Sequence, residues 1–193
     1  QPAGGSYVSN GGPLNGSLKL DGKNTPAKED SEEKIAAILK AAPKAEFNGN
    51  STVNGNIDNN LGLLTVNQGA TLNIEGKGNK VTNNGYIDLA GVLNGEINNN
   101  GNITVLDSAA HMTSFDGGEL NISADVAASS LVAEESNADE IYVSAGSSLD
   151  LDSENLKTSQ LTTYGTTKLG VDYTADAKVG NGGVLDLASS TLT

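Results

Sequence analysis

The chain has 193 residues, a net charge of −13 without a single arginine, and a hydrophobic content of 36%, which is low for a compact globule. Such a charge disfavours nucleic acid and anionic membrane surfaces as partners, because affinity for phosphate groups comes from lysine and arginine. The absence of cysteine excludes a disulfide framework and thiolate metal sites, and no apolar run reaches the roughly 18 residues of a membrane-spanning helix.

The first 45 residues differ from the rest in composition and in hydrophobic pattern. Residues 1–27 are rich in Gly, Asn, Ser and Pro and contain one strand-like run, so they predict an irregular leader or a first coil. Residues 28–45 predict a short amphipathic helix within positions 30–42, with Asp30 as N-cap, Glu33 three positions later and Pro43 as its limit. We expect this helix to cover the open end of a stack of strands. A docking helix for a partner is the alternative.

Residues 46–193 are expected to form strands and turns throughout. Residues 48–105 contain 16 asparagines around short apolar pairs that recur along the chain. Because successive side chains of a strand alternate between its two faces, each apolar pair buries little alone and must stack on its neighbours. The pattern predicts an all-β fold, a parallel β-helix (β-solenoid) of irregular coils. The recurring apolar pairs are Leu64-x-Val66, Leu72-x-Ile74, Ile87-x-Leu89 and Ile103-x-Val105.

A second phrase, G-x-x-L-x-[IL], begins at Gly69, Gly117, Gly146 and Gly182, at spacings of 48, 29 and 36 residues. Unequal spacing predicts coils of variable length with loop insertions. The best candidates for these insertions are residues 107–116 and 134–140.

The competing fold is a hairpin-rich antiparallel β-sandwich. Asn-Gly, the strongest short signal for hairpin turns, occurs eight times, beginning at Asn10, Asn15, Asn48, Asn54, Asn84, Asn94, Asn100 and Asn181. Against hairpins, many of these pairs lie in longer asparagine clusters, where stacked turns can form ladders of side-chain amides. Bulky cross-strand aromatic residues are also scarce, at 4% of the chain.

The run NNGYIDLAGVLNGEINNNGNITV, together with GATLNIEG, resembles the right-handed parallel β-helix of bacterial autotransporter passenger domains and related haemagglutinin-like adhesins. The likeness covers residues 50–106 best. It implies an exported protein at the bacterial cell surface, carried out by an outer-membrane β-barrel, and it transfers no catalytic residues because the matching positions are Gly, Asn and core aliphatics. The chain opens on Gln1, which fits a processed product.

Candidates for chemistry are few, so we assign no catalytic, cofactor-binding or metal-binding residues. The only histidine, His111, is expected in an exposed loop. Asp150, Asp152 and Glu154 alternate along one strand and could act as the carboxylate pair of a glycosidase, about 5–10 Å apart, or as calcium ligands. The simpler interpretation is a solvated outer face.

The expected function is therefore that of a non-catalytic, extracellular structural or adhesive module. It would bind host glycans, matrix or surface proteins, or copies of itself through one flank of the solenoid. A carbohydrate-active enzyme, or its inactive sugar-binding relative, is the alternative, and a passive spacer is a third hypothesis. Contact groups on a flank would be tyrosines, which combine an apolar ring with a polar tip. Half-buried strand positions are the simpler interpretation for the five tyrosines, which are Tyr7, Tyr86, Tyr142, Tyr164 and Tyr173.

Overall fold

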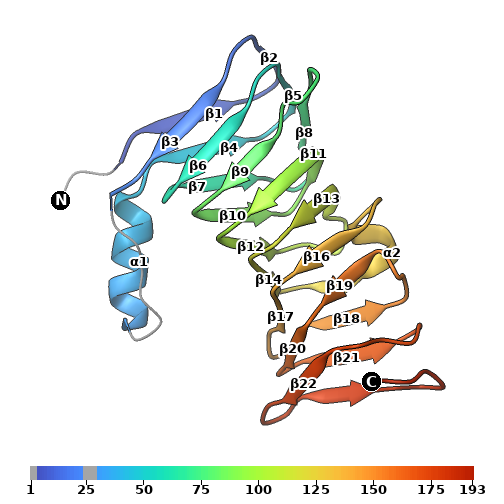
Figure 1. Ribbon diagram of the computed structural model, residues 1–193. Helices are drawn as coiled ribbons and strands as arrows, with labels where there is room; N and C mark the ends of the chain where they lie inside the picture. The colour runs from blue at the N-terminus through green and yellow to red at the C-terminus, as the bar shows by residue number, and fades with distance from the viewer. Residues whose placement is uncertain (1–3, 24–29) are drawn as a thin grey trace.

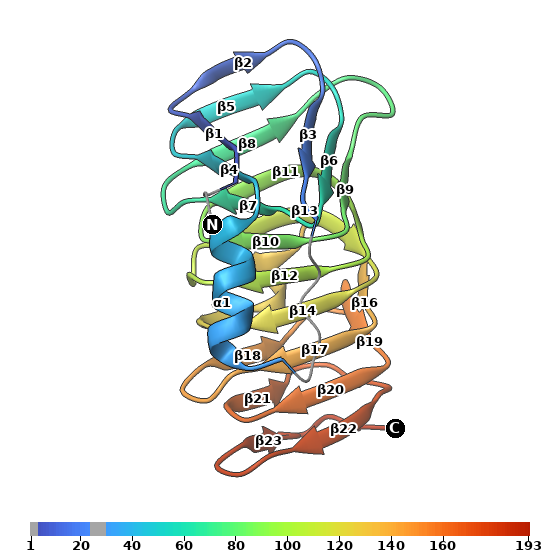
Figure 2. The ribbon, with the colours of Figure 1, turned by 90° about the vertical axis from the view of Figure 1, so that its left-hand side faces the viewer.

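The computed structural model describes residues 4–23 and 30–193. In this part the chain winds into an elongated stack of short strands and returns to the same faces in coil after coil (Figures 1 and 2). Every strand pairing in the described part is parallel. The predicted parallel β-solenoid is confirmed, and the antiparallel sandwich is wrong.

The strands form three sheets, which we call sheets A, B and C. Sheet A consists of β1 (Ser6–Ser9), β4 (Lys44–Phe47), β7 (Leu63–Val66), β10 (Tyr86–Leu89), β12 (Asn102–Val105), β14 (Glu119–Ile122), β17 (Glu140–Val143), β20 (Gln160–Thr163) and β22 (Asp176–Val179). Sheet B consists of β2 (Gly12–Leu14), β3 (Leu18–Asp21), β5 (Asn50–Val53), β6 (Ile57–Asn60), β8 (Thr71–Ile74), β9 (Val81–Asn83), β11 (Val92–Asn99), β13 (His111–Asp116), β16 (Ser136–Ala138) and β19 (Leu156–Thr158). Sheet C consists of β15 (Asp125–Ala127), β18 (Ser148–Leu151), β21 (Thr166–Leu169) and β23 (Val184–Asp186). The helices are α1 (Glu32–Ala41) and α2 (Ala128–Leu131).

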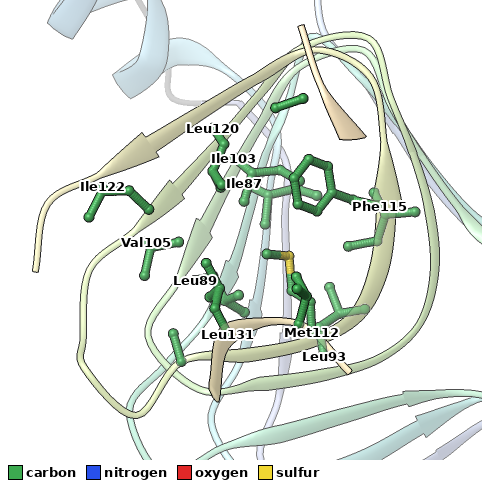
Figure 3. Close-up of a cluster of buried hydrophobic side chains, with 14 of the residues drawn as sticks. Ile87, Leu89, Leu93, Ile103, Val105, Met112, Phe115, Leu120, Ile122 and Leu131 are labelled. Atoms are coloured by element: carbon green, nitrogen blue, oxygen red, sulfur yellow. The ribbon is translucent and has the colours of Figure 1, made fainter. Parts of the chain in front are cut away.

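The core is a narrow column of aliphatic side chains from successive coils. In sheet A, Leu64, Ile87 and Ile103 occupy equivalent positions of neighbouring strands, and all three are fully buried. Figure 3 shows how side chains from sheets A and B converge on the middle of one such section. Burying a side chain of this size stabilises the fold by about 1.5–3 kcal/mol. The recurring apolar pairs predicted from the sequence therefore form the core of the solenoid.

The recurring G-x-x-L-x-[IL] phrase marks the entry into a strand, not the start of a coil. Its four copies lead into β8 of sheet B, β14 of sheet A, and β18 and β23 of sheet C. The first two spacings differ because those copies lie at different corners, whereas the last two copies lie at the same corner, two coils apart. The two predicted insertions are also wrong in most of their length, because they contain β13, β16 and the first residue of β17.

Three asparagines stack inside the corner that precedes strands β7, β10 and β12. Asn59 Nδ2 donates to Asn83 Oδ1 over 2.9 Å, and Asn83 Nδ2 donates to Asn99 Oδ1 over 2.8 Å. All three side chains are buried. The stack, which we call the inner ladder, ends where Asn99 Nδ2 donates to the carbonyl of Gly117 over 3.1 Å. It satisfies buried polar groups while linking one coil to the next.

Glycine lets neighbouring coils approach each other at the same corner. A Cβ at Gly85 would lie 2.6 Å from the carbonyl oxygen of Gly62, and one at Gly101 would lie 2.2 Å from that of Gly85. A type I′ hairpin turn needs φ > 0 at the asparagine of an Asn-Gly pair, and none of the eight asparagines has it. Asn-Gly therefore marks a stacked corner here, where several outer asparagines also form amide ladders, as expected from their clustering.

Helix α1 forms close to its predicted position but not at its predicted place in the fold. Ser31, not Asp30, is the N-cap, since its side chain accepts from the backbone N–H of Lys34 over 3.2 Å; Asp30 instead pairs with Lys34 Nζ over 2.8 Å. The helix lies beside the stack, in front of sheet A, rather than across the first coil (Figures 1 and 2). None of its side chains is buried. Residues 6–21 already form a coil, whereas residues 1–3 and 24–29 lie outside the described part.

The inner ladder yields a direct stability test. Asn83→Ala leaves the N–H of Gly85 without its partner and removes the amide links to Asn59 and Asn99. Asn99 Oδ1 still accepts from the N–H of Gly101, so we expect the free energy of unfolding to fall by about 2 kcal/mol. Asn84→Ala changes the exposed neighbour, whose Oδ1 accepts from Asn100, and should cost less than about 0.5 kcal/mol. Urea unfolding measures both values. Equal losses in the two variants would contradict the role given to the ladder.

Candidate binding face

The outer surface of sheet A is the longest regular surface of the molecule, because every coil contributes one strand to it. Alternate residues of each strand point outward, and the parallel register aligns them in two rows. We call these two rows the sheet A face. The first row is Ser6, Lys44, Leu63, Tyr86, Asn102, Glu119, Glu140, Gln160 and Asp176, and the second is Val8, Glu46, Thr65, Asp88, Thr104, Asn121, Tyr142, Thr162 and Lys178.

Three of the five tyrosines lie on this face or at its edge. Tyr86 and Tyr142 are half-buried members of the two rows, and Tyr164 follows directly after β20. The rings of Tyr142 and Tyr164 are in contact, with centroids 5.5 Å apart and planes tilted by 38°. Such half-buried tyrosines present a rigid apolar surface with a polar hydroxyl at the tip.

The other two tyrosines have structural positions. Tyr7 packs against the buried Phe47 in the first coils, with ring centroids 5.8 Å apart. Tyr173 is buried, and its hydroxyl donates to the carbonyl of Leu156 over 2.9 Å. Burial raises the pKa of Tyr173 to about 12. The flank of tyrosines expected from the sequence therefore contains Tyr86, Tyr142 and Tyr164.

Acidic groups run along the same face. Asp88 lies between Thr65 and Thr104 in the second row, and burial raises its pKa above the ordinary range of an aspartate. In the first row Glu119 and Glu140 are direct neighbours. Burial, and to a smaller extent the negative charge of Glu119, raise the pKa of Tyr86. The face thus combines aromatic rings and uncharged amide and hydroxyl groups with negative charge.

We expected His111 in an exposed loop, and this prediction is wrong. It is the first residue of β13, is half-buried, and its Nδ1 lies 2.8 Å from the carbonyl oxygen of Ser130. Its ring is thereby held against the end of α2, the short helix that ends at Leu131. No group of three or more His, Asp or Glu residues able to hold a metal ion occurs among the described residues.

The three alternating acids are only partly on one face. Asp150 points outward from β18 between the buried Leu149 and Leu151, as predicted. Asp152 lies beyond the strand end and accepts hydrogen bonds from the backbone N–H and hydroxyl of Ser129, over 2.9 and 2.6 Å. Partial burial opposes its charge, but these hydrogen bonds outweigh it and lower the pKa of Asp152.

Glu154, the third acid, lines a separate hollow with Lys157 and Tyr173. The trio is therefore spread over a strand, a corner and a hollow.

A different set of acids gathers in a hollow on sheet B, which we call the acidic hollow. It is an open depression of about 490 Å³, and its lining includes Glu96, Asp116, Glu134 and Glu135. It lies where the register between β11 and β13 shifts between Leu93 and Glu96, which is a β-bulge. Sequence reasoning missed this set because its members are up to 39 positions apart and meet only through the coil register.

Searches of protein-family models, curated proteins and solved structures find no match to this chain. No helix in residues 4–23 or 30–193 combines the length and the apolar character needed to cross a bilayer.

The burial of Asp88 yields a pH-dependent prediction. A raised pKa means that the folded state binds the proton more tightly than the unfolded chain, so this contribution to stability is complete below the unfolded value of about 3.9 and is lost as the pH rises through the folded value. Asp88→Asn should therefore be more stable than the native protein near neutral pH, and the difference should vanish in acid. Urea unfolding at several pH values measures it. Asp150→Asn, at an exposed position of β18, is the control, and an Asp88→Asn protein without added stability at neutral pH would contradict the prediction.

Proposed function

We propose that this protein is a non-catalytic structural or adhesive module, exported to a bacterial cell surface, that binds neutral or amine-bearing glycans through the sheet A face. Surface proteins and copies of the same chain are the other ligands that such a face could serve. The extracellular location rests on the resemblance of the asparagine-rich coils to autotransporter passenger domains.

The observation that carries the proposal is the continuous register of the sheet A face, although α1 stands in front of part of it (Figure 2). Nine strands at about 4.8 Å spacing give it a length of about 38 Å, enough for several sugar units in a row. Its register does not shift at any of its eight strand pairings. A ligand with repeating units would meet a repeating set of contacts on a rigid support.

The chemistry of the face suits sugars in two ways. Tyr86 and the contacting pair Tyr142 and Tyr164 offer flat apolar surfaces against which the C–H faces of a sugar ring can pack. Between them, Asn102 and Asn121 offer amide donors and acceptors, joined by a hydrogen bond of 3.3 Å from Asn121 Nδ2 to Asn102 Oδ1. Hydroxyl groups of sugars match both functions of an amide.

Charge narrows the ligand class. Asp88, Glu119 and Glu140 lie on the face, and the whole chain carries a charge of −13, so sulfated or carboxylated glycans would be repelled. Neutral or amine-bearing sugars avoid this repulsion. A single face of this kind binds weakly, and many copies on one cell would supply avidity.

The test is glycan binding by the native protein and by variants of the face. We expect Tyr86→Ala and Tyr142→Ala each to weaken binding about tenfold, because a tyrosine at the centre of an interface contributes about 1.4 kcal/mol or more. A glycan array followed by biolayer interferometry on the best ligand measures this, and urea unfolding shows that the variants remain folded. Asp150→Ala on sheet C is the control.

Two results would reject the proposal. If the native protein bound no glycan and no cell surface, a passive spacer would be favoured instead. If Asp150→Ala weakened binding as much as the tyrosine variants, the ligand would not lie on the sheet A face.

The acidic hollow supports a second candidate, a carbohydrate-active enzyme. Four carboxylates line this hollow of about 490 Å³ and could supply a proton donor and a base. One carboxyl group would then have to be protonated and another ionised, although all four are of similar kind. From the first proposal we expect the purified protein to release no reducing ends from a panel of polysaccharides. Release that Glu96→Gln abolishes and Tyr86→Ala does not would favour the enzyme.

A further inference from the structure

The eight Asn-Gly pairs are chemically the most labile part of this chain. In such a pair the backbone nitrogen of the glycine attacks the side-chain carbonyl carbon of the asparagine, a C–N bond forms, and ammonia leaves. Water then opens the succinimide ring to aspartate or isoaspartate. The reaction needs a glycine nitrogen that is free to attack and a side-chain amide that is free to turn. Both conditions can be read from the hydrogen bonds.

The two pairs next to the inner ladder fail both conditions. The N–H of Gly85 donates to Asn83 Oδ1, and the N–H of Gly101 donates to Asn99 Oδ1, each over 3.2 Å. The exposed amides are held as well, since Asn100 Nδ2 donates to Asn84 Oδ1 over 3.0 Å. In each pair the attacking nitrogen is therefore held by a buried oxygen, and the amide is held by the neighbouring coil.

A third pair is held in the same way by other groups. The N–H of Gly95 donates to Thr113 Oγ1 over 3.0 Å, and Asn94 Nδ2 donates to Asn73 Oδ1 over 3.0 Å. The arrangement at Asn94 lies outside the inner ladder, so it shows that stacking of coils, and not one special corner, restrains the reactive groups.

The pair at Asn181 is the opposite case. Asn181 and Gly182 are both exposed, they lie in a turn closed by the N–H of Gly183 donating to Gly180 over 2.9 Å, and Gly182 has a φ of 80°. Within residues 4–23 and 30–193, neither the Asn181 side chain nor the Gly182 N–H makes a hydrogen bond. Nothing lies within 4 Å of a Cβ built at Gly182, so the turn has room to rearrange.

We propose that the inner ladder protects the Asn84 and Asn100 pairs from deamidation, and that Asn181 is the site at which this protein deamidates first. Each ladder asparagine is itself followed by asparagine, Asn60 after Asn59, Asn84 after Asn83 and Asn100 after Asn99, and this slows the same reaction at the buried positions. The product at Asn181 adds one negative charge, and as isoaspartate one extra backbone carbon, to an exposed turn outside the stacked corner.

The test is a time course of the native protein at mildly alkaline pH, with peptide mapping by mass spectrometry to resolve aspartate and isoaspartate. Two hydrogen bonds hold each protected pair, so we expect Asn181 to deamidate at least about tenfold faster than Asn84 or Asn100. Equal rates at the three sites in the native protein would overturn the proposal, and this comparison needs no variant.

Asn99→Ala separates local protection from general opening of the fold. It removes the acceptor of the Gly101 N–H, so we expect the rate at Asn100 to rise about fivefold while the rates at Asn48 and Asn181 stay unchanged. Asn121→Ala, on the sheet A face, is the control and should change none of these rates. A uniform rise at all the Asn-Gly pairs of Asn99→Ala would show that loss of stability, not loss of the local bond, governs the reaction.

Discussion

The structure depends on the close approach of successive coils at one corner, where the backbone of one glycine rests on the backbone of the glycine above. Gly62, Gly85 and Gly101 form this column, and a single Cβ at Gly101 would lie 2.2 Å from a carbonyl oxygen. The inner ladder fixes the same corner from the inside, since each ladder asparagine both caps its own glycine and bonds to the next coil. Polar and steric constraints thus set the same spacing that the parallel sheets require.

A fixed spacing turns isolated residues into rows. Tyr86, Asn102 and Glu119 are 16 and 17 positions apart, yet they are direct neighbours on the sheet A face. Outward positions of the strands are not part of the core, because the core needs only the alternate positions. The chemistry of the face can therefore change from coil to coil while the support stays the same, which suits a binding surface better than a catalytic pocket.

Much of the core could be predicted from the sequence, because the apolar pairs repeat locally. The alternation around Ile87 and Ile103 is visible in a window of four residues. The sheet A face could have been found by aligning the residue between the two members of each pair, such as Asp88 and Thr104. The acidic hollow could not, since Glu96 and Glu135 meet only after the bulge in β11 and the path of α2 are known. The Asn-Gly pairs pointed to hairpin turns that the structure does not contain, and the reason is physical. Glycine is used both where φ is positive and where two backbones approach closely, and the sequence does not distinguish these uses.

The chemistry of the corner changes half-way along the stack, whereas sheet A does not. Beyond Asn99 the inner position is taken by Gly117, Ala138 and Thr158, and sheet C begins in the same region. Thr158 hydrogen-bonds to the backbone of Gln160, so it caps its own turn and does not bond to the next coil. The later coils are held together by sheet hydrogen bonds, apolar contacts and scattered side-chain links, such as Ser129 to Asp152 and Asn155 Nδ2 to the carbonyl of Ala133, without a buried amide ladder. Because β12, β14 and β17 keep one register across this change, the candidate binding face is independent of how the corner is closed.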